Sequence, residues 1–154
     1  AIVREVARRH PEIEIVVTQP GIAGTPGASR VTSVALPNGL APTLAHTDLA
    51  ILGGGISLYE AIAAGVPTVA VAIVASQRPT IRGFAAAGLA RDGAGRARTQ
   101  KDVAHRVADG VDEAIRDLAW RRHVRRAGPQ AIDGYGASRV ARAIVRLVGE
   151  TGRA

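Results

Sequence analysis

The stretch DLAILGGGISLYEAIAAGVPTVAVAI, residues 48–73, decides the expected fold. It contains the apolar run DLAIL (48–52) and all but the last residue of a second, VPTVAVAIV (66–74), which is apolar almost without interruption. Short apolar runs bounded by turn residues are typical of strands that are buried on both faces, as in parallel sheets. Between them, GGG (53–55) predicts a tight turn, and ISLYEAIAAG (56–65) predicts a helix that ends at its final glycine.

The same alternation of strand and helix continues on both sides of this stretch. Further strands are predicted at EIEIVV (12–17) and RVTSVAL (30–36), with the turn-rich QPGIAGTPGASR (19–30) between them. Helices are predicted over 1–10, 40–47 and 80–88, from a capping pair at Thr99 and Asp102 onward, and over 137–149. ASQRP (75–79) is interpreted as a polar loop, and Gly128-Pro129 is expected to interrupt the helical pattern. The expected buried faces of the last two helices are Val103, Val107, Val111, Ile115 and Leu118, and Val140, Ile144, Leu147 and Val148.

This order of elements predicts an α/β fold, a Rossmann-like doubly wound parallel sheet with helices on both faces. The 154 residues fit a single domain over residues 1–154. In an alternating fold a strand is expected before the helix at 1–10, and the chain has no methionine at position 1. We therefore expect the domain to be part of a longer protein.

The composition excludes several classes of protein. Hydrophobic residues make up 47% and charged residues 21%, which argues against disorder, and no apolar run approaches a membrane span. With no cysteine, disulfides and thiolate chemistry are excluded. The net charge of +7 is carried almost entirely by arginine, and aromatic residues are only 3% and scattered, so we expect no nucleic-acid partner. No signal peptide is recognised and nothing supports a membrane contact, so a cytoplasmic location is expected.

The glycine turn at 53–55 is a candidate phosphate site. Glycines let a backbone approach a ligand closely, and the N-terminus of the following helix presents free N–H groups and the positive end of its dipole. The turn follows a strand, and the carboxyl ends of parallel strands are where α/β sheets bind ligands. It lacks the third glycine of a dinucleotide fingerprint, because position 58 is Leu58, and it is not a P-loop. A plain strand-to-helix turn with no ligand remains the alternative interpretation.

Ser57 and Glu60 have two interpretations. Ser-x-x-Glu at a helix start is a capping box, in which both side chains satisfy N–H groups of the helix itself. Alternatively, Ser57 donates to a phosphate, and Glu60 accepts from two neighbouring ribose hydroxyls.

The remaining polar residues are assigned structural roles. The four histidines have neither metal-site nor catalytic-triad spacing and are interpreted as surface residues, so no metal and no cofactor is expected. RRHVRR (121–126) is interpreted as a solvated helix face. Asp133 is expected to shape the start of the last helix, and Arg139 to pair with a neighbour.

The order of strand, glycine-rich turn, helix with Glu60, Gly-Val-Pro, strand and a loop with Gln77 resembles the C-terminal domain of GT-B nucleotide-sugar enzymes. It is similar to MurG-like glycosyltransferases. It is closer to the PseG/SpsG-like group of UDP-sugar hydrolases and spore-coat polysaccharide proteins, whose D-G-x-G-x-x-R segment is matched by Asp133–Arg139. Ser76 departs from that pattern, which often has asparagine before the glutamine.

The resemblance implies a set of nucleotide-binding residues. They are Leu36, Pro37, Leu40, Gly53, Gly54, Gly55, Ser57, Leu58, Glu60 and Gln77. In this group the glycines and Ser57 would hold the diphosphate, Glu60 the ribose and Gln77 the sugar or phosphate. The uracil base would lie near Leu36, Pro37 and Leu40.

The resemblance also implies the partners, namely UDP or a UDP-sugar and an N-terminal domain of the same protein that carries the catalytic histidine. The implied reaction is hydrolysis of a nucleotide sugar, or transfer of its sugar to an alcohol as in the MurG-like enzymes. An epimerase half shares the expected fold. A non-catalytic module whose basic surface binds an anionic polymer is the alternative outside enzymes.

Overall fold

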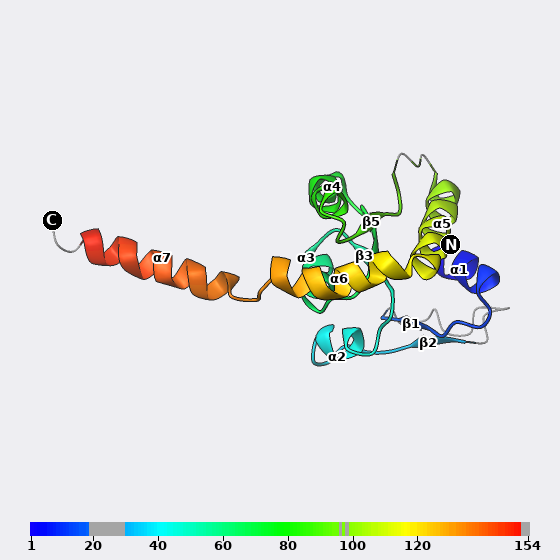
Figure 1. Ribbon diagram of the computed structural model, residues 1–154, viewed down its shortest axis with the longest axis horizontal. Helices are drawn as coiled ribbons and strands as arrows, with labels where there is room; N and C mark the ends of the chain where they lie inside the picture. Colours follow the sequence, from blue (N-terminus) through cyan, green and yellow to red (C-terminus); the bar gives the residue numbers. More distant parts are fainter. Residues whose placement is uncertain (19–29, 96, 98, 152–154) are drawn as a thin grey trace.

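A computed structural model of the chain describes residues 1–18, 30–95, 97 and 99–151, and it shows parallel strands flanked by helices (Figure 1). The strands are β1 (Ile15–Val17), β2 (Val31–Ser33), β3 (Ala50–Gly53), β4 (Thr68–Val71) and β5 (Arg91–Asp92). The α-helices are α1 (Ile2–Arg9), α2 (Ala41–Leu44), α3 (Ile56–Ala63), α4 (Arg78–Ala86), α5 (Gln100–Arg116), α6 (Leu118–Ala131) and α7 (Gly136–Thr151), and a 3-10 turn, η1 (Ala75–Gln77), precedes α4. No helix of the described residues is long and apolar enough to cross a membrane.

The strands form two parallel sheets. One has the order β1-β2 with Val16 opposite Thr32, and the other has the order β3-β4-β5 with Ile51 opposite Val69. Every neighbouring pair is parallel, as predicted. Parallel neighbours require crossover connections, and α3 and α4 supply them for the larger sheet.

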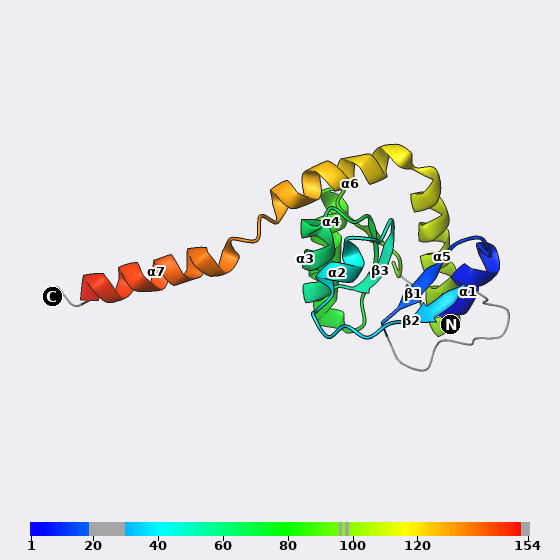
Figure 2. The same cartoon turned by 90° about the horizontal axis from the view of Figure 1, so that it is seen from below.

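Helices cover both faces of the larger sheet, which confirms the doubly wound arrangement (Figure 2). Successive side chains of β4 point to opposite faces, as they must in a strand. Val69 packs against Val107 of α5. Ala70 lies in a separate cluster with Leu58 of α3 and Ile81 of α4. Leu58, Val69, Ala70 and Val107 are fully buried, so the core lies in two layers, one on each side of β4.

The strands and helices predicted in the first two thirds of the chain are confirmed, most with shorter bounds, and the helix predicted at 80–88 is shifted to Arg78–Ala86. The helix predicted at 56–65 ends with Gly65 in the left-handed region, at φ +70, which is the expected terminating glycine. The loop predicted at 75–79 is instead η1 and the start of α4, because Pro79 suits the first turn of a helix. β5 was not predicted, since two polar residues carry no strand pattern. The turn-rich stretch at 19–30 lies, apart from Arg30, outside the described residues.

The long predicted helix is two helices, α5 and α6, which meet at Asp117. The capping box at the start of α5 is confirmed, with Asp102 N donating to Thr99 Oγ1 and Thr99 N donating to Asp102 Oδ2. Asp117 has a non-helical backbone, and its Oδ1 accepts from Trp120 N at 2.9 Å, so it caps α6. Leu118, expected on the buried face, begins the new helix and is 47% exposed.

Gly128-Pro129 does not interrupt the helix, contrary to the prediction, because α6 continues to Ala131. Gly128 permits close packing, since a Cβ there would lie 2.3 Å from the carbonyl oxygen of Ile62 on α3. Pro129 cannot donate a hydrogen bond to the carbonyl of Arg125. That carbonyl oxygen lies 2.9 Å from where Gly65 would carry a Cβ. The pair therefore joins α6 to the end of α3.

The predicted burial of the last helix is wrong. Val140, Ile144, Leu147 and Val148 of α7 are each more than half exposed. Both views show α7 extending away from the rest of the described chain (Figures 1 and 2). The amphipathic pattern identified the apolar face correctly, but no described part of the chain covers it.

Candidate functional site

The glycine turn lies at the carboxyl end of β3, as predicted. Gly53 is the last residue of the strand, and Gly55 is the N-cap of α3. Gly54 is buried, and a Cβ at this position would lie 2.7 Å from Cγ1 of Ile81 and 3.0 Å from Cβ of Gln77. None of the three glycines has a positive φ. Glycine is thus required at position 54 by close packing against α4 rather than by backbone conformation.

The N-terminus of α3 has no side-chain cap. Its N-cap, Gly55, carries no side chain, and Ser57 is already the second residue of the helix. The capping box proposed for Ser57 and Glu60 is therefore wrong, in contrast to the real capping box at Thr99 on α5. The first N–H groups of any helix have no acceptor within the helix. Here Leu58 N donates to the carbonyl of Gly55, which leaves the N–H groups of Ile56 and Ser57 and the positive end of the dipole at the carboxyl edge of the sheet.

Two predicted side chains share one face of α3. Ser57 and Glu60 are three residues apart, a spacing that places side chains side by side along a helix. Glu60 is exposed and Ser57 is half-buried. Leu58 points the other way into the core, and its N–H donates to the carbonyl of Gly55 at 3.1 Å. The structure thus leaves Ser57 and Glu60 accessible to a ligand and places the Leu58 side chain out of reach.

Gln77 joins the glycine turn to the end of β4. Its Oε1 accepts from Gly54 N at 3.2 Å and from Ile73 N at 2.9 Å. Its Nε2 lies 3.5 Å from where Gly55 would carry a Cβ. Gln77 is therefore on the rim with the glycines, as predicted, but its oxygen has a structural role in holding the turn, and its amide donor lies beside Gly55.

The loop after β2 holds the three residues predicted near a base. Leu40 precedes α2 and packs with Leu52 against a cluster that includes Ala61 of α3. Leu36 is half-buried and Pro37 is exposed. This loop follows the carboxyl end of β2, and the glycine turn follows the carboxyl end of β3, a strand of the other sheet. Within the described ranges, no hydrogen bond connects Leu36 or Pro37 to the glycine turn.

An exposed apolar rim surrounds the turn and was not predicted. Ile56 begins α3 and is 80% exposed, and Ile73, which follows β4, is 76% exposed. Val74 and Tyr59 are also exposed, and Cδ1 of Ile73 lies 3.0 Å from where Gly53 would carry a Cβ. Exposed apolar residues beside backbone donors are typical of a surface that receives a ligand or another domain. In the sequence, Ile56 directly follows the glycine turn and Ile73 lies at the end of the next apolar run. Both isoleucines resemble ordinary core residues, so the sequence pattern did not indicate that they are exposed.

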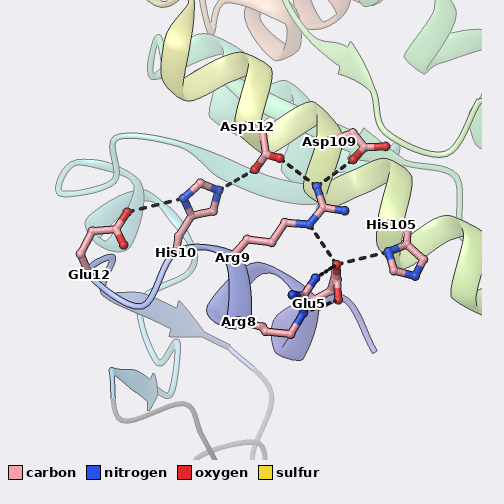
Figure 3. Close-up of polar contacts among 8 residues, drawn as sticks. All are labelled: Glu5, Arg8, Arg9, His10, Glu12, His105, Asp109 and Asp112. Atoms are coloured by element: carbon pink, nitrogen blue, oxygen red, sulfur yellow. Dashed lines mark hydrogen bonds and ion pairs between the residues drawn. The ribbon is translucent and has the colours of Figure 1, made fainter.

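A polar cluster between α1 and α5 forms a second candidate (Figure 3). Arg9 donates to Glu5, Asp109 and Asp112 at 2.7–2.9 Å. His10 is only 17% exposed and its Nε2 lies 2.6 Å from Asp112 Oδ1, so the interpretation of this histidine as a surface residue is wrong. An open cavity of about 560 Å³ adjoins these side chains and Arg116.

The charges in this cluster are balanced within the protein, which indicates a structural role for it. Hydrogen bonds from Arg8 and then from Arg9 lower the pKa of Glu5 from 4.5 to about 2. Burial acts to raise the pKa of Asp112, but hydrogen bonds from His10 and then from Arg9 outweigh it and lower that pKa. These ionised carboxylates neutralise the charge of Arg9, so it is not available to bind an anion.

The Asp133–Arg139 segment is a local structural motif, as expected. Arg139 donates two hydrogen bonds to Asp133, at 2.7 and 2.9 Å, and Tyr135 N donates to Asp133 Oδ1 at 3.0 Å. The bonds from Arg139, and then that from Tyr135, lower the pKa of Asp133 to about 2. Gly134 has φ +75. The motif closes the turn that begins α7.

The chain is similar to the spore coat polysaccharide biosynthesis protein SpsG of Bacillus subtilis (strain 168), with 33% identity over 104 residues. This similarity covers 67% of the chain and 30% of SpsG, so the matched part spans less than a third of that protein. No protein-family profile matches the chain, and no solved structure matches it. The comparison supports a distant relationship between this chain and the SpsG family.

Proposed function

We propose that residues 1–154 form the nucleotide-sugar-binding domain of a PseG/SpsG-like GT-B enzyme. This enzyme would hydrolyse the bond between sugar and diphosphate in a UDP-sugar, within surface-polysaccharide or glycan biosynthesis. The observation that carries the proposal is the uncapped N-terminus of α3, which follows a glycine turn at the carboxyl end of β3. The distant similarity to SpsG, whose name refers to polysaccharide biosynthesis, supports a sugar substrate.

In this proposal, the backbone N–H groups at the start of α3 bind the diphosphate. Helix N-termini are well suited to phosphate because the donors and the dipole act together. Glu60, exposed beside Ser57, accepts hydrogen bonds from two ribose hydroxyls. The Nε2 group of Gln77 is positioned near Gly55 to donate to a phosphate or sugar oxygen.

The proposed reaction is attack on the anomeric carbon of the sugar. A bond from the nucleophile to that carbon forms as the bond to the diphosphate oxygen breaks, and UDP leaves with the electron pair. The N-terminus of α3 stabilises the negative charge that develops on the departing diphosphate. With water as the nucleophile the enzyme is a hydrolase, and with an alcohol it is a MurG-like transferase. The group that deprotonates the nucleophile is assigned to the N-terminal domain, so this chain alone should bind UDP without turnover.

Calorimetric titration of UDP tests the proposal. Replacing Glu60 with alanine removes the acceptor for the ribose hydroxyls and should weaken UDP binding by about 1–3 kcal/mol. The matched control is Glu14→Ala, because Glu14 is an exposed carboxylate before β1 and far along the chain from the turn. The two variants lose the same negative charge, so a general electrostatic effect on the anionic UDP would strengthen binding to both equally, whereas loss of the ribose contact weakens binding to Glu60→Ala alone. Equal affinities for all three proteins, or binding of heparin that UDP does not displace, would contradict the proposal.

A further inference from the structure

One side-chain oxygen accepts hydrogen bonds from the ends of two neighbouring strands. Gln77 Oε1 accepts from Gly54 N at 3.2 Å and from Ile73 N at 2.9 Å. The last paired residues of β3 and β4 are Gly53 and Val71. Both donors lie just beyond that pair, where the strand ladder no longer supplies an acceptor. The Gln77 side chain therefore continues the connection between β3 and β4 past the end of their ladder.

The backbone of Gln77 is itself held in place. Gln77 is the last residue of η1 and the N-cap of α4, and its N–H donates to Val74 O at 3.1 Å. Its Cβ lies 3.0 Å from where Gly54 would carry a Cβ, and the residue is half-buried. The acceptor oxygen is thus attached to a fixed point on α4, and the glycine turn packs closely against it.

The two donors fix the orientation of the Gln77 amide. A backbone N–H group only donates, so the side-chain oxygen and not the nitrogen must face both of them. The amide nitrogen, bonded to the same carbon, lies 3.5 Å from where Gly55 would carry a Cβ. Within the described part of the chain this nitrogen has no acceptor. The oxygen is therefore used by the protein, and the nitrogen stays available.

The turn that the oxygen holds is one that needs a restraint. Three successive glycines have more conformational freedom than any other residues, and Gly55 caps α3 without a side chain. Gly54 is separated by Gly55 alone from Ile56 and Ser57, whose N–H groups are the candidate donors to a diphosphate. A restraint on Gly54 consequently acts within two or three residues of those donors.

We propose that Gln77 is a positioning residue for the candidate diphosphate site. Its Oε1 reserves the Gly54 N–H for the protein, so Gly54 does not bind the ligand, and the N–H groups of Ile56 and Ser57 are kept in a fixed direction. The inference rests on the proposed function for the identity of the ligand. It goes further, because it gives the oxygen a role separate from the ligand contact of Nε2 and removes Gly54 from the diphosphate ligands that the resemblance implies.

A fixed turn matters because of what the donors have to do. Donors that already point at the developing charge stabilise it without reorganising at the moment of reaction. A mobile glycine turn would instead lose conformational freedom each time a ligand bound, and that loss would weaken binding. The clamp formed by Gln77 Oε1 removes this freedom before the ligand arrives.

The first test measures NMR order parameters of the Gly54, Ile56 and Ser57 amides without ligand. Gln77→Met has a side chain of similar length and no oxygen, whereas the matched control Gln77→Glu keeps two acceptor oxygens. The wild type and Gln77→Glu should give values of about 0.85, and Gln77→Met should fall below about 0.6. Thr99→Ala removes an acceptor from the start of α5, and this loss of one comparable bond elsewhere should leave the turn rigid.

The second test follows the clamp in the wild type while UDP is added. Scalar couplings across hydrogen bonds, from the Gly54 and Ile73 nitrogens to the side-chain carbonyl carbon of Gln77, detect it directly. Both couplings should persist at saturation. Gln77→Met should bind UDP about ten-fold or more weakly, since the donor and the clamp are both lost, and Thr99→Ala should bind as the wild type does.

Two results would overturn the inference. Order parameters in Gln77→Met equal to those of the wild type would show that the oxygen does not position the turn. Loss of the Gly54 coupling on addition of UDP would show that Oε1 only occupies the place of a phosphate oxygen in the free chain. A wild type that does not bind UDP would contradict the proposed function, whereas the order parameters decide the clamp without any ligand.

Discussion

At the scale of single residues, Gly54 shows why a glycine run is ambiguous in a sequence. The three consecutive glycines predicted a turn that a ligand can approach. The sequence alone could not show whether a glycine is needed there for ligand access or for close packing against another element. The structure shows that Gly54 is restricted by Ile81 and Gln77, while Gly55 has space and a free position before α3. The positions expected around the turn were predictable, whereas the apolar rim at Ile56 and Ile73 was not, because exposure depends on tertiary neighbours.

Gly54→Ala should destabilise the chain by about 1–3 kcal/mol, because its Cβ would lie 2.7 Å from Ile81 Cγ1. Chemical denaturation measures the change. In the double variant with Ile81→Ala, the combined loss should be smaller than the sum of the single losses, since the clash is removed. Gly55→Ala is the control, with its nearest contact at 3.5 Å, and should change stability little. Strictly additive losses would show that Ile81 is not the obstacle.

At the scale of elements, the contact between α3 and α6 depends on one glycine. The dipeptide Gly128-Pro129 was interpreted as a helix break, because both residues disfavour helix interiors. Packing overrides that preference here, since Gly128 allows the backbone of α6 to approach the Ile62 carbonyl. The low helix propensity of Gly128 and Pro129 can be read from the sequence. The close contact between the backbones of α6 and α3 cannot, because it depends on the tertiary structure.

Gly128→Ala should therefore be among the most destabilising single substitutions in the chain, costing about 3 kcal/mol or more. The Cβ would lie 2.3 Å from a backbone oxygen, which cannot rotate away as a side chain can. Thermal and urea unfolding measure the loss. Gly149→Ala on α7 is the matched control, since nothing lies within 4 Å of that position. Similar stabilities for the two variants would contradict the close contact.

The ion-pair cluster between α1 and α5 should make stability depend on acid pH (Figure 3). The pKa of Glu5 is about 2 in the folded chain, against 4.5 without its partners. Ionised Glu5 therefore favours folding above about pH 4.5, and this contribution is lost as the pH falls through about 2. The difference in unfolding free energy between the wild type and Glu5→Gln should be present above about pH 4.5 and shrink between about pH 4.5 and 2. A difference independent of pH would exclude this role for Glu5.

At the scale of the whole molecule, alternation of strands and helices was predictable and the burial of α7 was not. Periodicity in the sequence identifies which face of a helix is apolar. Whether that face is buried depends on another apolar surface that packs against it, which the helix sequence does not reveal. In the described chain Val140 and Ile144 remain exposed. The same limit applies to the sheet, which was expected to be continuous and is divided between β1 and β3.

Removing residues 133–154 should leave the stability of the remaining chain almost unchanged. No described side chain of α7 is buried, so the deletion exposes no core. The melting temperatures of the truncated and complete chains should agree within a few degrees, on the order of the shift caused by ~1 kcal/mol. A large drop on truncation would show that α7 folds back onto the sheets in solution.

The most direct test of the central claim is a titration of UDP followed by backbone NMR of the complete chain. The account predicts saturable shifts at the amides of Gly55, Ile56 and Ser57 and at the side-chain amide of Gln77. The amides of Arg9 and Asp112, in the cluster between α1 and α5, should not respond. Shifts confined to that cluster or to the arginines of α6, or no shifts at all, would contradict a nucleotide site at the start of α3.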